Sequence, residues 1–350
     1  MASLSDLLEE RGVLLADGAT GSNLFEMGLQ SGESPELWND LHPDRIAANY
    51  RSFIDAGSDI ILTNTFGGNR FRLGLHDASD RVGELNAKAA RIAREQVDRT
   101  RRPVIVGGSM GPTGEILEPL GSLSIERAAE VFAEQALALE AGGADVIWIE
   151  TISSLEEAQA ALAGAAETDL PAVLTFSVDT NGRTMMGLTP SEIVKFTAGT
   201  GHRPFAVGAN CGVGAADLIA SVINMQHEVR NLSLSTIVIA KANCGVPEYV
   251  DGKIVYSGTE AIMSEYARIA MDSGARIIGG CCGTTPNHVR AMRDAIDGHR
   301  RGDFPDVEKI ESKLGPVSTG ARSQMLGDLS IAGGARRPPR ERKTRRGRRR

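Results

Sequence analysis

The sequence predicts a (β/α)8 barrel, also called a TIM barrel, on the basis of three observations. Eight short apolar runs recur along most of the 350 residues, each has the length of a strand, and helix-like stretches separate them. Near-continuous apolar runs of this length are typical of strands buried on both faces in a parallel sheet. The runs occupy residues 13–17, 59–63, 103–107, 145–149, 172–176, 205–208, 236–240 and 275–279.

Two other arrangements stay open at this level. A doubly wound open sheet also alternates strands with helices, and a short apolar run can be a buried segment of helix. The barrel is favoured because there are eight runs and because no Gly-x-Gly-x-x-Gly pattern follows the first. Helix-start signals support the alternation, since Ser124 is a candidate N-cap and Ser154 and Thr189 each begin a predicted capping box.

The charge divides the chain into two parts. The formal net charge is −7, but residues 336–350 hold ten Lys or Arg against one Glu, which gives that segment +9 and leaves −16 on residues 1–335. We predict a barrel domain over residues 1–312 and a disordered, low-complexity, Arg-rich tail over residues 313–350. An acidic barrel argues against nucleic-acid binding, so only the tail is a candidate for it, and a solvated tail is the simpler interpretation.

The composition and the first residues exclude several classes of protein. The start of the chain lacks the basic and apolar regions of a signal peptide, and no apolar run approaches the roughly 18 residues of a membrane-spanning helix. Four cysteines are too few for a disulfide framework in a chain of this size. We therefore expect a cytoplasmic protein with reduced cysteines and no membrane partner; a homo-oligomer stays open.

All four cysteines follow predicted strands directly, at the end of the barrel where the active sites of this fold lie. Clustered thiolates favour Zn²⁺, and three protein ligands with an open fourth position are typical of a catalytic zinc site. None of the six histidines ends a predicted strand, which argues against a His-rich hydrolytic site. The cysteines are Cys211 after the sixth run, Cys244 after the seventh, and Cys281 and Cys282 after the eighth.

Three thiolates on Zn²⁺ leave a negative centre, which is a poor Lewis acid but suits the binding of a substrate thiol as a nucleophilic thiolate. The expected reaction is therefore an attack by zinc-bound sulfur on an electrophilic carbon. Besides the adjacent pair, either Cys211 or Cys244 can supply the third ligand. The sixth and eighth strands contribute to the same layers of a barrel, which favours Cys211 without deciding the question.

These segments resemble the zinc-dependent homocysteine S-methyltransferases, over about residues 10–300. Within that family the sequence looks most like the bacterial betaine–homocysteine methyltransferases. The GGCCGT segment with an upstream Asn-Cys is a highly specific match. The matching segments are DGATG at 17–21, TNTF at 63–66, GP at 111–112, Glu150, NC at 210–211, NCGVP at 243–247 and GGCCGT at 279–284.

The resemblance implies both a reaction and a metal site. A methyl group passes from betaine to the zinc-bound thiolate of homocysteine, giving methionine and dimethylglycine. Cys211, Cys281 and Cys282 are the implied zinc ligands, and Cys244 occupies a variable position beside them. A non-catalytic zinc- or thiol-binding barrel is the rival interpretation.

The resemblance also implies how homocysteine is held. Glu150, with Asp17, is expected to receive its ammonium, the backbone around Gly18 its carboxylate, and Asn210 is carried over as a further substrate-binding residue. These acidic side chains argue against a protein that merely stores zinc, because storage does not require them beside an open metal position.

The methyl donor is less strongly indicated. A quaternary ammonium is best held against aromatic faces, and Trp38 is the candidate donor contact. Trp148 shares its strand parity with Glu150, so it faces the barrel interior, where core packing is expected. Betaine-using relatives carry a Tyr just after the second strand, where this chain has Gly67. A sulfonium donor, S-methylmethionine or dimethylsulfoniopropionate, is therefore the alternative.

Overall fold

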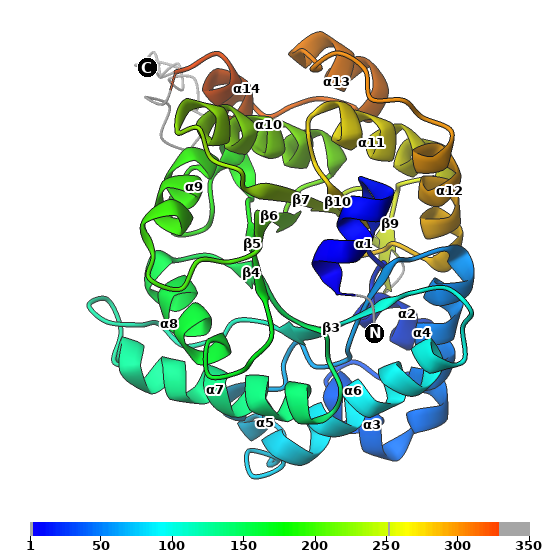
Figure 1. Cartoon of the computed structure of the whole chain (residues 1–350), viewed down its shortest axis with the longest axis vertical. Coiled ribbons are helices and arrows are strands. Elements are labelled where there is room, and N and C mark those ends of the chain that lie inside the picture. The colour runs from blue at the N-terminus through cyan, green and yellow to red at the C-terminus, as the bar shows by residue number, and fades with distance from the viewer. Residues whose placement is uncertain (1–2, 251–252, 329–350) are drawn as a thin grey trace, which may run out of the picture.

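The computed structural model describes residues 3–250 and 253–328, excepting the side chains at 180, 247–250 and 253–255, and it confirms the predicted barrel (Figure 1). Eight parallel strands form one sheet in the order β1-β10-β7-β6-β5-β4-β3-β2. A bridge between Ala16 and Ile60 joins β1 to β2 and closes the ring. The barrel strands are β1 (Leu14–Leu15), β2 (Ile60–Leu62), β3 (Ile105–Met110), β4 (Val146–Ile152), β5 (Ala172–Ser177), β6 (Ala206–Cys211), β7 (Ile237–Ala242) and β10 (Ile277–Gly280).

Helices surround the sheet, and a short antiparallel pair lies between β7 and the last barrel strand. That pair is β8 (Pro247–Val250) and β9 (Lys253–Tyr256). The helices are α1 (Leu4–Arg11), α2 (Gly21–Glu26), α3 (Trp38–Leu41), α4 (Pro43–Ala56), α5 (Arg70–Gly74), α6 (Val82–Asp98), α7 (Ile125–Ala141), α8 (Leu155–Ala165), α9 (Pro190–Gly199), α10 (Ala215–Asn231), α11 (Glu260–Asp272), α12 (Pro286–Asp297), α13 (Val307–Leu314) and α14 (Thr319–Met325), with 3₁₀ turns η1 (Pro35–Leu37) and η2 (Thr180–Gly182).

The predicted helix starts are confirmed, with one difference. The side chain of Ser124 caps α7, and Thr189 forms a complete capping box at α9. Ser154 caps α8 by accepting the backbone N–H of Glu157. The Glu157 carboxylate does not return to the cap, because it accepts hydrogen bonds from the N–H and hydroxyl of Thr113, at 2.8 and 2.7 Å.

The N-terminal end of the barrel is closed and filled. Figure 1 shows α1 lying across the opening of the ring, and its Leu4, Leu7 and Leu8 belong to the same buried cluster as Trp148 in the barrel interior. Gly107 leaves room in this interior, since a Cβ there would come within 2.6 Å of the Leu62 side chain.

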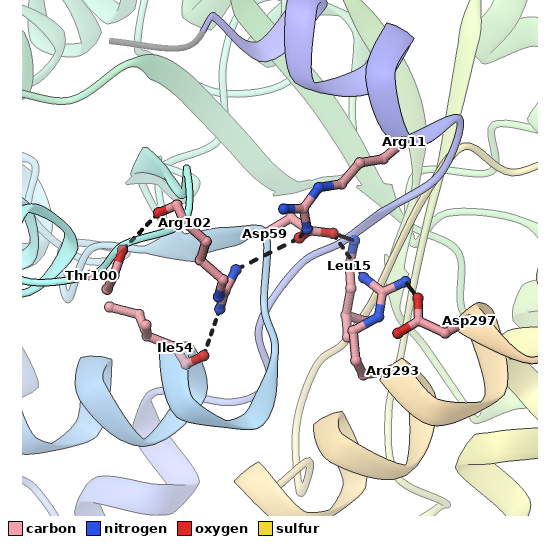
Figure 2. Close-up of polar contacts among 8 residues, drawn as sticks. All are labelled: Arg11, Leu15, Ile54, Asp59, Thr100, Arg102, Arg293 and Asp297. Carbon is pink, nitrogen blue, oxygen red and sulfur yellow. Dashed lines mark hydrogen bonds and ion pairs between the residues drawn. The ribbon is translucent and has the colours of Figure 1, made fainter.

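A buried carboxylate ties α1 and its neighbours to this closed end. Asp59 is fully buried just before β2, between the guanidinium groups of three arginines (Figure 2). One oxygen pairs with Arg11 and lies 3.7 Å from Arg102; the other accepts from Arg293 at 3.0 Å and from the backbone N–H of Leu15 at 2.8 Å. Asp59 thus links α1, β1, the start of β3 and α12.

The chain beyond the barrel differs from the expectation. Residues 313–350 were predicted to form a disordered tail, but α13 extends to Leu314 and α14 follows it. In α14, Ala321 is fully buried, and the Gln324 amide donates to the carbonyls of Asn181 and Gly182 at 3.0 and 2.9 Å. The helix forms because it packs on the barrel, a contact that local composition does not reveal. The Arg-rich segment from 336 lies outside the described residues.

No helix within the part of the chain that the structure describes is long and apolar enough to cross a membrane.

Candidate active site and metal centre

The inner wall of the barrel changes from apolar to charged toward its C-terminal end. Trp148 and Ile239 lie in the apolar interior cluster, and two residues further along the same strands come Glu150 and Lys241. Side chains two apart on a strand point to the same face, so both charged groups point into the barrel. In the structure, Trp148 and Glu150 therefore both point into the barrel, as predicted.

A cavity of about 390 Å³ opens above this charged layer. Its wall is built from the loops after β1 and β2 and from the ends of most other barrel strands. It includes Gly18, Glu150, Lys241 and three cysteines, with Glu36 and Phe66 nearer the loops. The predicted site end of the barrel thus contains an accessible space.

Three thiols meet at one side of this cavity. The sulfur atoms of Cys211, Cys281 and Cys282 all lie within 4.8 Å of one another, with 3.9 Å between those of Cys211 and Cys282. Zn–S bonds of about 2.3 Å in a tetrahedral site place thiolate sulfurs roughly 3.8 Å apart, so the trio fits a zinc ion. Without a metal, the neighbouring Cys211 thiol and burial raise the pKa of Cys281 to about 12, so an ion must displace the protons.

Two asparagines hold the thiol-bearing loops in place. The Asn210 side chain accepts from the N–H of Thr151 at 2.9 Å and donates to the Thr151 hydroxyl at 2.8 Å, and its amide lies 3.9 Å from the Cys281 sulfur. Asn243 accepts the N–H of Cys282 at 3.1 Å and donates to the carbonyl of Gly212 at 2.8 Å. Asn210 thus lies beside a thiol of the trio, and its predicted contact with substrate stays a prediction.

Cys244 lies apart from the trio. It is fully buried, and its sulfur is 3.5 Å from Nε2 of His288. Its backbone N–H donates to the carbonyl of Cys282 at 2.9 Å, so it supports the loop that carries the adjacent pair. This position matches the expectation that Cys244 is a neighbour of the site.

A buried ion pair forms one side of the charged layer. Nζ of Lys241 lies 3.1 Å from Oδ1 of Asp17, and both side chains are only 2% exposed. The second Asp17 oxygen accepts the backbone N–H of Leu62 at 2.7 Å. Burial opposes the charge on Lys241, but the carboxylates of Asp17 and Glu150 outweigh that effect and raise the pKa of the ammonium, which stays protonated.

Glu150 forms the opposite side of this layer. Its Oε1 accepts a 2.5 Å hydrogen bond from the Ser109 hydroxyl, and burial raises the pKa of its carboxyl. The salt bridges found in the described part of the chain include none between Glu150 and Lys241, although both line the cavity. Glu150 is therefore a carboxylate with capacity for a cationic ligand.

Comparison with known proteins places this chain in a family. A model described as "Homocysteine S-methyltransferase" matches residues 14–296. The chain belongs to the homocysteine S-methyltransferase family. The methionine synthases of Mycobacterium tuberculosis and Mycobacterium leprae are each 30% identical to it, over 95% and 87% of this chain. This chain covers only 29% and 26% of the lengths of those two relatives.

Solved structures support the fold of this homocysteine S-methyltransferase family member. The homocysteine methyltransferase MmuM of Escherichia coli, in its oxidized form, superposes with a TM-score of 0.67 at 22% identity, covering 84% of this chain and 99% of that one. A metallated form of the same protein gives a TM-score of 0.65, also at 22% identity, covering 83% of this chain and 99% of that one. At this identity the likeness establishes the fold.

Of the predicted substrate residues, Gly18 and Glu150 line the cavity, whereas Asp17, Asn210 and Trp38 do not, and Trp38 has other contacts. Trp38 is 3% exposed, its ring is 4.6 Å from that of His42, and the guanidinium of Arg45 lies 5.0 Å from its centre. Trp38 is not among the described residues that line the cavity. Instead, Phe66 lines it, with 39% of its surface exposed.

The sequence analysis assigned no role to three residues that shape the site, Ser109, Asn243 and Lys241, although Asn243 begins a segment that matches the family. The seventh strand was predicted to end at Ala240, but it extends to Ala242, so Lys241 lies within it. A Lys two residues after Ile239 shares its inward face, and this parity was the available signal. Its pairing with Asp17, far away in the sequence, depends on the closed ring.

Proposed function

We propose that this protein transfers a methyl group to the sulfur of homocysteine, forming methionine, at a zinc ion held by Cys211, Cys281 and Cys282. The observation that carries the proposal is the position of three thiols on the wall of a cavity that also contains Glu150 and Lys241. Zinc, when bound, holds the substrate thiol as a thiolate at neutral pH. Family membership supports the same activity.

The chain's own residues bind and orient the substrate. Glu150 accepts the ammonium of homocysteine, because it is buried, lines the cavity and has only the Ser109 hydroxyl as a described hydrogen-bond partner. Both Asp17 oxygens already have partners, so we assign Asp17 chiefly to holding Lys241, and its predicted ammonium contact stays a prediction. Asn210 and Asn243 position the cysteine loops.

We propose a small methyl-onium carboxylate as the donor, with glycine betaine first and a sulfonium compound as the second candidate. Phe66 offers one aromatic face to an onium group. Glu36 also lines the cavity, and its carboxylate occupies the space beside Gly67, where it accepts the Gly67 N–H and the Ser34 hydroxyl, both at 2.7 Å. A fully methylated onium group has no N–H to donate, so this carboxylate would attract it by charge alone. One aromatic face and a carboxylate suit a cationic donor, and the single face favours testing sulfonium donors alongside betaine.

The chemistry balances as a direct displacement. A bond forms between the homocysteine sulfur and the methyl carbon while the methyl–nitrogen bond of betaine breaks, and its electron pair leaves with the nitrogen as dimethylglycine. The thiol proton goes to solvent when homocysteine binds. With a sulfonium donor the broken bond is methyl–sulfur and the leaving group is a thioether.

A donor panel tests the proposal. The zinc-loaded protein is assayed for methionine formation from homocysteine with glycine betaine, dimethylsulfoniopropionate or S-methylmethionine, before and after chelation of zinc. We expect methionine with at least one donor and its loss on chelation, restored by added zinc. Binding of zinc and thiols with no methyl transfer from any donor would support the non-catalytic barrel instead.

A further inference from the structure

Lys241 is a buried cation that is only partly paired. Its side chain is 2% exposed, its Nζ is 5.5 Å from the ring centre of Trp148 below it, and it donates to Asp17 at 3.1 Å. An ammonium group has three N–H donors. Among the residues that the structure describes, Asp17 is its only hydrogen-bond partner, and Lys241 lines the cavity.

Burying an incompletely paired ammonium is unfavourable unless a ligand completes its hydrogen bonds. The open side of Lys241 faces the same cavity as Glu150, whose carboxylate is the complementary charge, yet no ion pair joins these two among the described side chains. At its inner end the cavity wall therefore presents Lys241 and Glu150, a positive and a negative group that no described salt bridge joins, while its other charged residues, Glu33, Glu36 and Arg72, come from the loops and helix after β1 and β2. That pattern complements a molecule carrying a carboxylate and an ammonium on neighbouring atoms, the α-amino acid end of homocysteine.

We propose that Lys241 binds the carboxylate of the homocysteine substrate while Glu150 binds its ammonium, so that the pair selects an α-amino acid thiol over other thiols. The inference rests on the proposed function and makes Lys241 a specificity-determining residue. Gly18 follows Asp17 directly and lines the same cavity, so its backbone, the predicted carboxylate site, lies on the Lys241 side. Asp17 then acts as a positioning residue that keeps the ammonium in place.

Truncated substrates separate the two contacts. Aminopropanethiol lacks the carboxylate of homocysteine, and mercaptobutanoate lacks its ammonium, while both keep the thiol. Calorimetry on the zinc-loaded protein measures the affinity of each thiol for the wild type, Lys241→Met, Lys241→Arg and Glu150→Gln. Since every ligand keeps its thiol, the contribution of the metal cancels from the ratios.

We expect the wild type to bind homocysteine roughly 10- to 100-fold more tightly than either truncated thiol, the range for a hydrogen bond to a charged group. Lys241→Met should remove the discrimination against aminopropanethiol and keep that against mercaptobutanoate; Glu150→Gln should do the reverse. Lys241→Arg should keep part of the carboxylate preference. If Lys241→Met weakens all three thiols equally, Lys241 only supports the site and the proposal is overturned.

A second variant serves as a control for misfolding. Lys241→Met leaves Asp17 without its cation, so the double change Asp17→Asn with Lys241→Met removes both charges and keeps the interior neutral. The double variant should show the same loss of carboxylate preference, and a retained preference in it would contradict the assignment. Because binding is measured directly, absence of methyl transfer in the donor panel refutes the proposed function but not the binding assignment.

Discussion

Each end of the barrel buries an aspartate, and the two aspartates differ in how many partners surround them. Asp59, at the N-terminal end, is surrounded by three arginines and a backbone N–H. Asp17, at the C-terminal end, has one lysine and one backbone N–H, and a cavity adjoins the pair. The closed end is saturated with partners, which suits stability, whereas the open end leaves binding capacity for a ligand, as expected for the catalytic face of this fold.

The largest effect should come from the open end, where the cysteines differ in role. Cys281→Ser removes a thiol from the trio, so we expect loss of stoichiometric zinc and at least a roughly thousand-fold drop in kcat/KM, because substrate activation depends on the metal. Cys244→Ser is the matched control, since Cys244 lies outside the trio. Metal analysis and the methyl-transfer assay check both. Activity of Cys281→Ser in the absence of zinc would refute the metal site.

At the closed end, stability should change rather than activity. Asp59→Asn leaves three guanidinium groups without their shared counter-charge, and breaking a buried pair in this way costs about 3 kcal/mol of unfolding free energy. The arginines keep 16–30% exposure, which places the effect at the lower end of that range. Asp297→Asn, which removes an exposed partner of Arg293, should cost under about 1 kcal/mol.

Denaturant unfolding measures both closed-end variants, and kcat/KM is taken per folded molecule below the transition. If Asp59→Asn lowers kcat/KM of the folded protein more than a few fold, the closed end also affects catalysis. The assignment of stability to one end and ligand binding to the other would then be wrong.

Local patterns predicted most of the barrel. Strand-length apolar runs located all eight strands, and period-two alternation together with the strand-end rule placed Glu150 and the cysteines at one mouth. These inferences need only a few consecutive residues and the general architecture of the fold. The packing of α14 on the barrel depends on contacts between distant segments, because Gln324 donates to the carbonyls of Asn181 and Gly182, and composition does not encode them. Trp38 lies in the main buried cluster, although its ring contacts are to its sequence neighbours His42 and Arg45.

Local sequence patterns also failed to predict one residue of the charged layer. Asp17 and Glu150 could be selected because both belong to segments that match the family. Lys241 directly follows its predicted strand, as Glu150 does, but it lies outside every matching segment. Its partner Asp17 is 224 residues away, and only the closure of β1 against β10 and β7 brings them together. The sequence therefore indicated the two carboxylates of the charged layer, Asp17 and Glu150, but not the lysine ammonium that lies in the same layer.

The smallest effect concerns the stability of the open end without ligand. Burial raises the pKa of Glu150 in the folded protein, so folding favours its protonated form. That contribution to stability is fully present below the ordinary carboxyl pKa of 4.5 and is lost as pH rises through the raised value. Glu150→Gln keeps an acceptor for the Ser109 hydroxyl without a charge, so it should stabilise the ligand-free protein by about 1 kcal/mol at neutral pH.

This gain should shrink toward zero as pH falls below 4.5, which unfolding titrations of metal-free, reduced protein would measure. Ser109→Ala is the matched control, because it removes the hydrogen bond and leaves the carboxyl group. A Glu150→Gln protein that is less stable than the wild type at neutral pH would mean that Glu150 is satisfied without substrate. The open end would then resemble the closed one, and the contrast between the two buried aspartates would no longer mark the site.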